Sequence, residues 1–174
     1  MEKIKLINRN PLTSTDKIVI AVHVLASVGM WISYKQHLLP VDTLKDVVNM
    51  YLFMMPMLLI GIFFRNLRNF NFYIIWVLIG IAQLIVYPEL IGMSEFEFFR
   101  GSAFSGLRAL LPTVLMFQLL RIVFIKTHNM EMIISIRQYR MSRWEEEENR
   151  NMTWLEVAFS ITLLLTAIFS NVYE

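Results

Sequence analysis

Five apolar stretches dominate the chain, and each is close to the length that an α-helix needs to cross a lipid bilayer. A hydrocarbon core about 30 Å thick requires roughly 20 apolar residues in a helix. Only 17% of the residues are charged, against about a quarter in soluble domains. The sequence therefore predicts an all-α fold: an integral membrane helical bundle with five transmembrane helices, or four if the last stretch does not insert. The stretches cover residues 18–39, 47–64, 70–87, 103–125 and 153–172.

The distribution of Lys and Arg between the predicted loops gives the orientation of these helices. Cytoplasmic loops of membrane proteins carry an excess of these residues. With a cytoplasmic N-terminus, eleven of them fall in inner segments and two, Lys45 and Arg100, fall in outer loops. We therefore expect an N-in protein of the plasma membrane, such as a bacterial inner membrane. Its parts would be a cytoplasmic segment 1–17, a four-helix transmembrane bundle 18–125, a cytoplasmic basic amphipathic loop 126–152, and a fifth helix with an outer C-terminus over 153–174.

The inner loop carries three arginines at helical spacing, Arg137, Arg140 and Arg143. Apolar residues that include Met132 and Ile133 are interleaved with them, so this segment predicts a basic amphipathic helix. Helices of this kind lie on anionic lipid headgroups. The loop is thus the predicted contact with the bilayer or with a partner. A solvated helical arm is the alternative.

Two arginines lie within the fourth stretch, where a charge is costly. Arg108 and Arg121 are thirteen positions apart, which is about 20 Å along a helix and less than the thickness of the bilayer core. Side chains lean toward the helix N-terminus, so Arg108 leans toward the outer surface while Arg121 leans into the membrane. An arginine left in hydrocarbon costs about 2.5–3.5 kcal/mol. We therefore expect Arg121 to pair with Glu156, at the inner end of the last stretch. The alternative is that Arg121 reaches the headgroups unaided.

Pro56, Pro112 and His23 are the remaining structural candidates within the spans. A proline inside a helix removes a backbone hydrogen bond and bends the helix, so we expect kinks at Pro56 and Pro112. A hinge or gate at these positions is the alternative. His23 is expected to be a hydrogen-bonded packing residue rather than a proton relay.

The sequence carries no recognisable catalytic or cofactor motif. With no cysteine, it has no disulfide, thiol nucleophile, iron–sulfur cluster or Cys-based zinc site. Its three histidines are scattered and make no metal site. A phosphate-binding loop, a dinucleotide-binding glycine pattern and an HExxH pair are also missing. A net charge of +2 with dispersed basic residues argues against nucleic acid as a partner. We therefore expect a protein that is not an enzyme and that binds no cofactor or metal.

These observations favour a structural or interaction subunit of a membrane complex, which assembles with copies of itself or with other membrane proteins. The alternative is an oligomeric channel or pore, or a small transporter subunit. A pore or transporter differs from a structural subunit in that polar residues must line a path across the membrane. Every charged residue within a predicted span lies within about two turns of an end, so no polar track crosses the midplane of one copy. A pore would need several copies.

Overall fold

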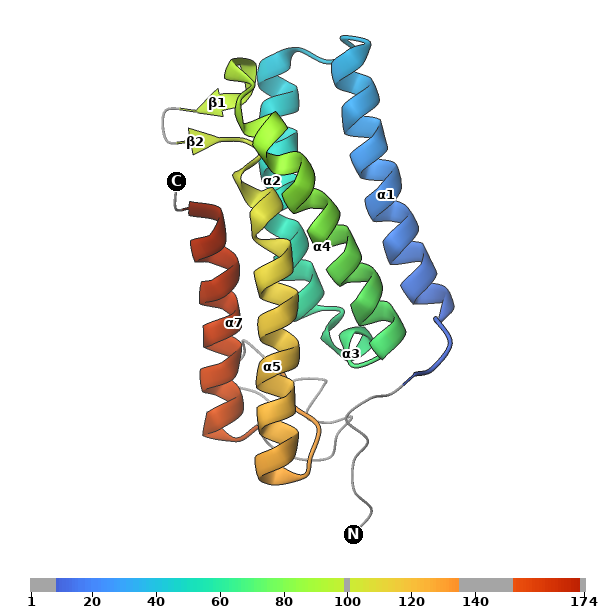
Figure 1. The fold of residues 1–174 in the computed structure, drawn as a ribbon, viewed down its shortest axis with the longest axis vertical. Helices are drawn as coiled ribbons and strands as arrows, with labels where there is room; N and C mark the ends of the chain where they lie inside the picture. Colours follow the sequence, from blue (N-terminus) through green and yellow to red (C-terminus); the bar gives the residue numbers. More distant parts are fainter. Residues whose placement is uncertain (1–8, 99–100, 135–151, 173–174) are drawn as a thin grey trace.

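The computed structural model describes residues 9–98, 101–134 and 152–172, and this part of the chain forms a bundle of long helices (Figure 1). The long helices are α1 (Ser14–Lys35), α2 (Val41–Gly61), α4 (Phe70–Ile91), α5 (Leu110–His128) and α7 (Trp154–Val172). The short elements are the helix α3 (Phe64–Leu67), the 3-10 turns η1 (Ser94–Phe96) and η2 (Ser105–Arg108), and the antiparallel strands β1 (Glu97–Phe98) and β2 (Gly101–Ser102).

Helices occupy all five predicted spans, which confirms the all-α prediction, and four of them have the length of a membrane span. The helices at these four spans are long and apolar enough to cross a membrane: Ser14–Lys35, Val41–Gly61, Phe70–Ile91 and Ser105–His128. The helix α7 also occupies the fifth predicted span, but its apolar stretch, Trp154–Ser170, is shorter than the other four.

A side-chain cap explains why α1 begins four residues before the predicted span. The Oγ1 atom of Thr13 accepts from the N–H of Asp16 at 3.2 Å, and the Oδ2 atom of Asp16 accepts from the N–H of Thr13 at 2.7 Å. This reciprocal pair satisfies backbone donors that a helix start leaves free. Asp16 is 1% exposed, and its Oδ1 atom accepts from the Nδ2 atom of Asn66 at 2.6 Å. The cap therefore also ties the start of α1 to α3.

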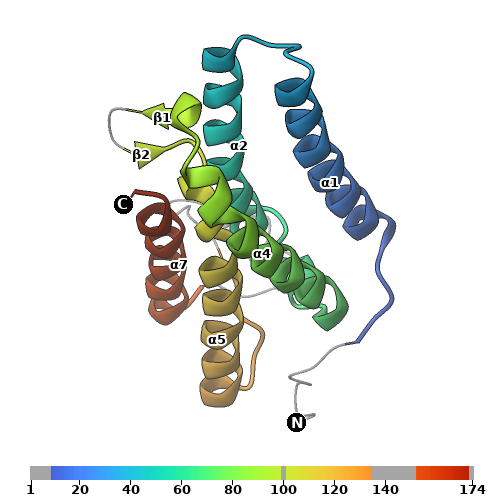
Figure 2. The same cartoon turned by 45° about the horizontal axis from the view of Figure 1, so that its top comes forward.

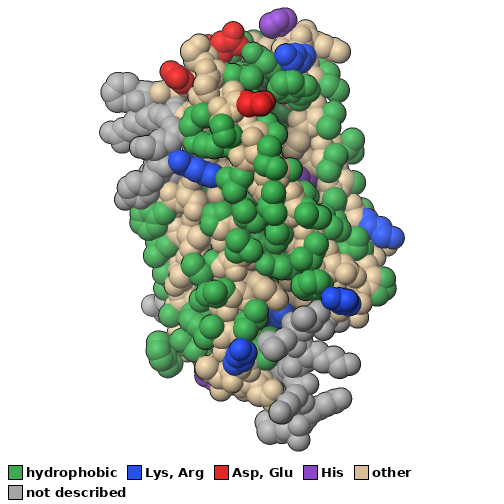
Figure 3. All heavy atoms as spheres, in the orientation of Figure 1, with side chains coloured by type: hydrophobic (Ala, Val, Ile, Leu, Met, Phe, Trp, Pro, Cys, Tyr) green, Lys and Arg blue, Asp and Glu red, His purple; other side chains and the backbone are tan. Residues whose placement is uncertain are grey.

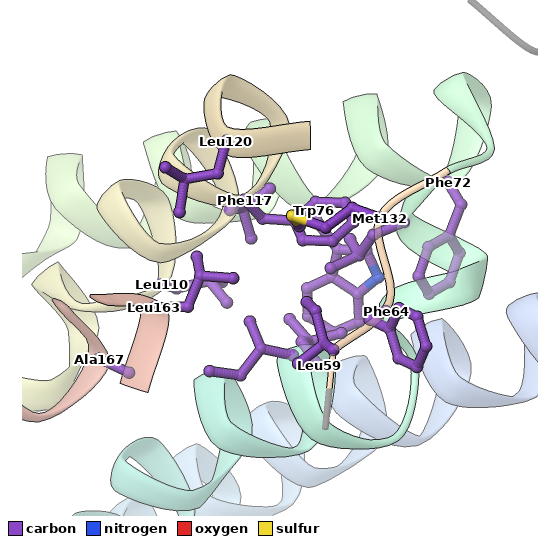
Figure 4. Close-up of a cluster of buried hydrophobic side chains, with 14 of the residues drawn as sticks. Leu59, Phe64, Phe72, Trp76, Leu110, Phe117, Leu120, Met132, Leu163 and Ala167 are labelled. Atoms are coloured by element: carbon purple, nitrogen blue, oxygen red, sulfur yellow. The ribbon is translucent and has the colours of Figure 1, made fainter. Parts of the chain in front are cut away.

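The hydrophobic core lies between α2, α4, α5 and α7, where large apolar side chains interlock (Figure 4). Helices α4 and α5 approach closely at Gly80, because a Cβ atom added there would lie 3.0 Å from the Cβ of Leu111. Helix α1 lies at the edge of the bundle (Figure 2), and only Asp16 and His23 of its residues are buried. The core residues include Leu59, Phe64, Trp76, Leu110, Phe117 and Leu163.

The fourth predicted span contains two kinds of helix. Residues 105–108 form the 3-10 turn η2, and α5 begins at Leu110. Pro112 is the third residue of α5, in the first turn, where a missing N–H removes no helical hydrogen bond. The kink that we expected at Pro112 stays a prediction, and the structure places a change from 3-10 helix to α-helix just ahead of this residue. Pro56, in contrast, is buried in the interior of α2.

After α5 the chain turns back against the end of the bundle. Asn129 has a φ of 50° in the left-handed region, and its N–H donates to the carbonyl of Ile125 at 2.8 Å, which ends the helix. The next residues are not helical, yet Met132, Ile133 and Ile134 are 1%, 0% and 3% exposed. The prediction that placed Met132 and Ile133 on an amphipathic helix at the lipid surface is therefore wrong, because these side chains are buried in the bundle.

Candidate functional site

A cavity of about 360 Å³ lies between α1, α2 and α4. It runs along the half of the bundle that contains the C-terminal part of α1, the N-terminal part of α2 and the C-terminal part of α4. Residues of η1 and η2 complete its wall. Most of the lining side chains are apolar, among them Met30, Leu52, Val86, Met93, Phe96 and Leu107.

Polar side chains meet at one end of the cavity, around His23. This residue is 4% exposed, and its Nδ1 atom lies 2.6 Å from the hydroxyl oxygen of Tyr51. Its Nε2 atom lies 3.5 Å from the Nε2 atom of Gln83. The imidazole also stacks on the Tyr51 ring and contacts the Trp76 ring, with centroid distances of 5.7 Å and 5.0 Å. These contacts hold the imidazole in one orientation between α1, α2 and α4.

The hydrogen-bonding capacity of this group is not exhausted. A neutral imidazole has one donor and one acceptor nitrogen, so one of them serves Tyr51 and the other faces Gln83. The Oε1 atom of Gln83 is buried and has no hydrogen-bond partner among the described residues. Gln83 and His23 both line the cavity, together with Ser27. A ligand in the cavity could therefore both donate a hydrogen bond to this end and accept one from it.

Charged side chains are found at the opposite end of the cavity, outside its lining. The hydroxyl of Tyr34 donates to the Oε2 atom of Glu95 at 3.3 Å. The ammonium of Lys35 lies over the Trp31 ring, 5.0 Å from its centroid. Among the described residues that line the cavity, none is Asp, Glu, Lys or Arg. The cavity thus offers apolar contact along its length, neutral hydrogen bonding at one end and charges beyond the other.

A second polar cluster lies where the end of α5 meets the segment 130–134, and Arg121 is at its centre. Arg121 is 1% exposed, and its guanidinium donates to both oxygens of Glu131, with Nε–Oε2 and Nη2–Oε1 distances of 2.9 Å and 2.6 Å. Glu131 also lies 3.7 Å from the Nε atom of Arg68. The Nη2 atom of Arg68 donates to the carbonyl of Met132 at 2.5 Å. Arg121 of α5 and Arg68 in the turn between α3 and α4 therefore both hold the returning segment.

Glu156 holds the same segment from the other side. It is fully buried, and its Oε1 atom accepts from the N–H of Ile133 at 2.7 Å. Its Oε2 atom accepts from the N–H of Thr153 at 2.9 Å and from the Thr153 hydroxyl at 3.1 Å. This carboxylate therefore caps the start of α7 and fixes the segment 130–134 to it. The predicted pair of Arg121 with Glu156 remains a prediction, but both residues anchor one segment.

Arg108 connects η2 to α7 at the end of the bundle opposite to this second polar cluster. Its Nε atom donates to the carbonyl of Ser170 at 3.2 Å, close to the C-terminal end of α7. Its guanidinium carbon lies 5.6 Å from the centroid of the Tyr87 ring. A cation is favourable beside carbonyls at a helix C-terminus. The outward lean of Arg108 stays a prediction, and the structure shows that its side chain binds across to the C-terminal end of α7.

Two residues of these clusters, Tyr51 and Glu131, were missed in the sequence. Residue 23 lies fourteen positions before the turn residue His37, and residue 51 lies fourteen positions after it. Residues equally far from the turn of a helical hairpin lie at the same depth, so Tyr51 could have been found opposite His23. Glu131 offered no such signal, because the left-handed turn at Asn129 that brings it back to Arg121 is invisible in the apolar pattern.

Arg137, Arg140 and Arg143 lie outside the described residues. Within the residues that the structure describes, no group of three or more His, Asp or Glu side chains is arranged to hold a metal ion. The chain matches no known protein-family model, no characterised protein and no solved structure.

Proposed function

We propose that this chain is an integral membrane protein with a cytoplasmic N-terminus. It would act without catalysis, as a structural or interaction subunit of a membrane complex. The four long apolar helices support membrane insertion. Exposed apolar side chains on α1 and α4, such as Leu25, Leu78 and Ile85, are 60% to 71% exposed. Such surface suits contact with lipid or with another membrane helix.

The two ends of the bundle differ in charge, which supports the orientation. On the face in Figure 3, acidic side chains gather at the end that carries β1 and β2 in Figure 1, while basic ones predominate at the opposite end. Cytoplasmic ends of membrane helices are rich in Lys and Arg. The basic end would therefore face the cytoplasm, and we call it the inner end. Its described basic residues include Arg9, Lys17, Arg65, Arg68 and Lys126.

The packing of the helices between the two ends of the bundle favours a non-conducting role over a pore or transporter. A pore or transporter needs a polar path through the membrane midplane. Here the interior between α2, α4, α5 and α7 is filled by apolar side chains. The hydroxyls of Thr113 and Ser160 in this region donate within their own helices, to the carbonyls of Ala109 at 2.7 Å and of Glu156 at 2.8 Å. The part of one copy that lies between α2, α4, α5 and α7 thus provides a packed scaffold rather than a conduit.

Two measurements on the same preparation test this proposal. The protein is extracted in native nanodiscs and its mass is determined, because a subunit of a complex should travel above the 20.6 kDa of one chain. It is then reconstituted in liposomes and assayed for flux of ions and small solutes. We expect a higher mass and no flux above that of empty liposomes. Flux that scales with the amount of protein would contradict the proposed role and favour an oligomeric pore, and a monomer in native nanodiscs would contradict the subunit role.

A further inference from the structure

We infer that the cavity between α1, α2 and α4 binds an uncharged, single-chain amphiphile of the quinone or long-chain alcohol type. Its polar head would hydrogen-bond to His23 and Gln83, and its chain would lie along the apolar wall toward Phe96. This inference rests on the proposed location in a membrane, because only lipid would supply such a ligand at useful concentration.

The depth of the polar group selects an uncharged head. His23 is nine positions from Ser14 and twelve from Lys35, the ends of α1. At 1.5 Å per residue these are about 14 Å and 18 Å, so a spanning α1 would place His23 near the middle of a bilayer core about 30 Å thick. A charged head costs several kcal/mol at that depth in the absence of an opposite charge, and the described lining carries none. Phospholipid and fatty-acid heads are thereby disfavoured.

The size of the cavity is that of a small-molecule site. From His23 to Tyr34 the cavity follows eleven positions of α1, which is about 16 Å along a helix. Its volume of about 360 Å³ lies at the lower end of the range for small-molecule sites, roughly 300–1,000 Å³. One flexible chain that lies along α1 therefore suits both the length and the volume of the cavity.

The hydrogen-bonding groups match the chemistry of such a head. Quinone carbonyls accept hydrogen bonds, and the imidazole with the Gln83 amide supplies donors. A hydroxyl, in a quinol or an alcohol, can also donate to the Oε1 atom of Gln83, which has no partner among the described residues. An unsatisfied buried polar atom carries a free-energy penalty, and a bound hydroxyl would remove it. The contact between His23 and Tyr51 keeps the imidazole ready for this role.

Quenching of tryptophan fluorescence by decylubiquinone tests the inference on the full-length protein in nanodiscs, because Trp31 lines the cavity. Dodecanol and dodecanoate, which differ in the charge of the head, then compete with the bound quinone. We expect saturable quenching, and we expect dodecanoate to displace the quinone much less well than a neutral competitor. Displacement by dodecanol would show that any neutral head is accepted, whereas its failure would restrict the site to quinones. Both results support a neutral-head site, whereas efficient displacement of the quinone by dodecanoate, with or without displacement by dodecanol, overturns it.

Two cavity variants and one matched control locate the binding. Ala82→Phe places a ring into the cavity and should abolish saturable quenching, whereas Ala21→Phe on the exposed surface of α1, outside the lining, should leave the affinity unchanged. Gln83→Leu removes the hydrogen bonds of the amide and should weaken binding about 3- to 10-fold. Wild-type affinity in both cavity variants would overturn the assignment. Such a failure would leave the proposed subunit role intact, since that role is read from mass and flux.

Discussion

Removing the carboxylate that binds Arg121 should destabilise the protein strongly. In Glu131→Gln the buried guanidinium, 1% exposed, loses a charged partner held by two hydrogen bonds of 2.9 Å and 2.6 Å. Removing one member of a buried ion pair costs about 3–5 kcal/mol, against 0–1 kcal/mol at a surface. The side chain of Glu131 is 22% exposed, and glutamine keeps one acceptor oxygen. We therefore expect a loss of about 2–3 kcal/mol in the free energy of unfolding.

For a chain of this size that loss corresponds to a fall in melting temperature of about 5–10 °C. Melting in detergent micelles, followed by tryptophan fluorescence, measures it. Glu89→Gln is the matched control, because Glu89 is exposed and should change the stability by less than about 0.5 kcal/mol. The same Glu131→Gln change is also made in an Arg121→Met background, which separates this pair from the other contacts of the arginine.

In that background the buried cation is gone, so the second substitution should cost less than half of its effect in the wild type. The reasoning is refuted if Glu131→Gln melts within about 1 °C of Glu89→Gln, or if its effect is the same with and without the arginine. Either result would mean that Glu131 does not neutralise Arg121 in solution.

Two further changes test the packing of the bundle. Glu156→Gln weakens the acceptor for the N–H of Ile133, which lies 2.7 Å away. It should therefore speed amide hydrogen exchange at Ile133 by about tenfold. Exchange in the middle of α5 should stay unchanged and is the internal control. Equal exchange in both proteins would contradict the anchoring role of the carboxylate. Gly80→Ala forces a methyl group to 3.0 Å from the Cβ of Leu111 and should cost about 1–3 kcal/mol, measured as a lower melting temperature. Gly29→Ala, where a Cβ would meet nothing within 4 Å, should be neutral or slightly stabilising, and equal losses in the two variants would refute the close approach of α4 and α5.

The long helices could be predicted because lipid-length apolar runs leave few alternatives, whereas their starts depend on local chemistry. The apolar run of α1 begins at Ile18, but the cap of Thr13 and Asp16 extends the helix back to Ser14. Polar residues in the first turns of α2 likewise continue the helix outside the apolar run, which starts at Val47, back to Val41. Hydropathy reports where a helix is apolar and does not report where it begins.

The contacts of the candidate site could likewise be predicted from the sequence only in part. The burial of His23 follows from a polar ring in an apolar helix, and its hydrogen bond to Tyr51 follows from their equal distance from one turn. The partner of Arg121 does not follow, because it depends on the chain reversing at Asn129 and packing Met132 into the core. Such a chain reversal depends on one residue in the left-handed conformation and on tertiary packing, so the periodicity of apolar residues does not predict it.

A membrane-spanning bundle has its two ends on opposite sides of the membrane, and cysteine labelling can test this because the sequence contains no cysteine. Ser14→Cys at the inner end and Ser94→Cys at the outer end are matched substitutions at exposed positions. A membrane-impermeant maleimide is added to intact cells and, in parallel, to lysed cells. We expect the cysteine at position 94 to react in intact cells and the cysteine at position 14 to react only after lysis. Reaction of both positions, or of position 14 alone, in intact cells would contradict this placement of the two ends.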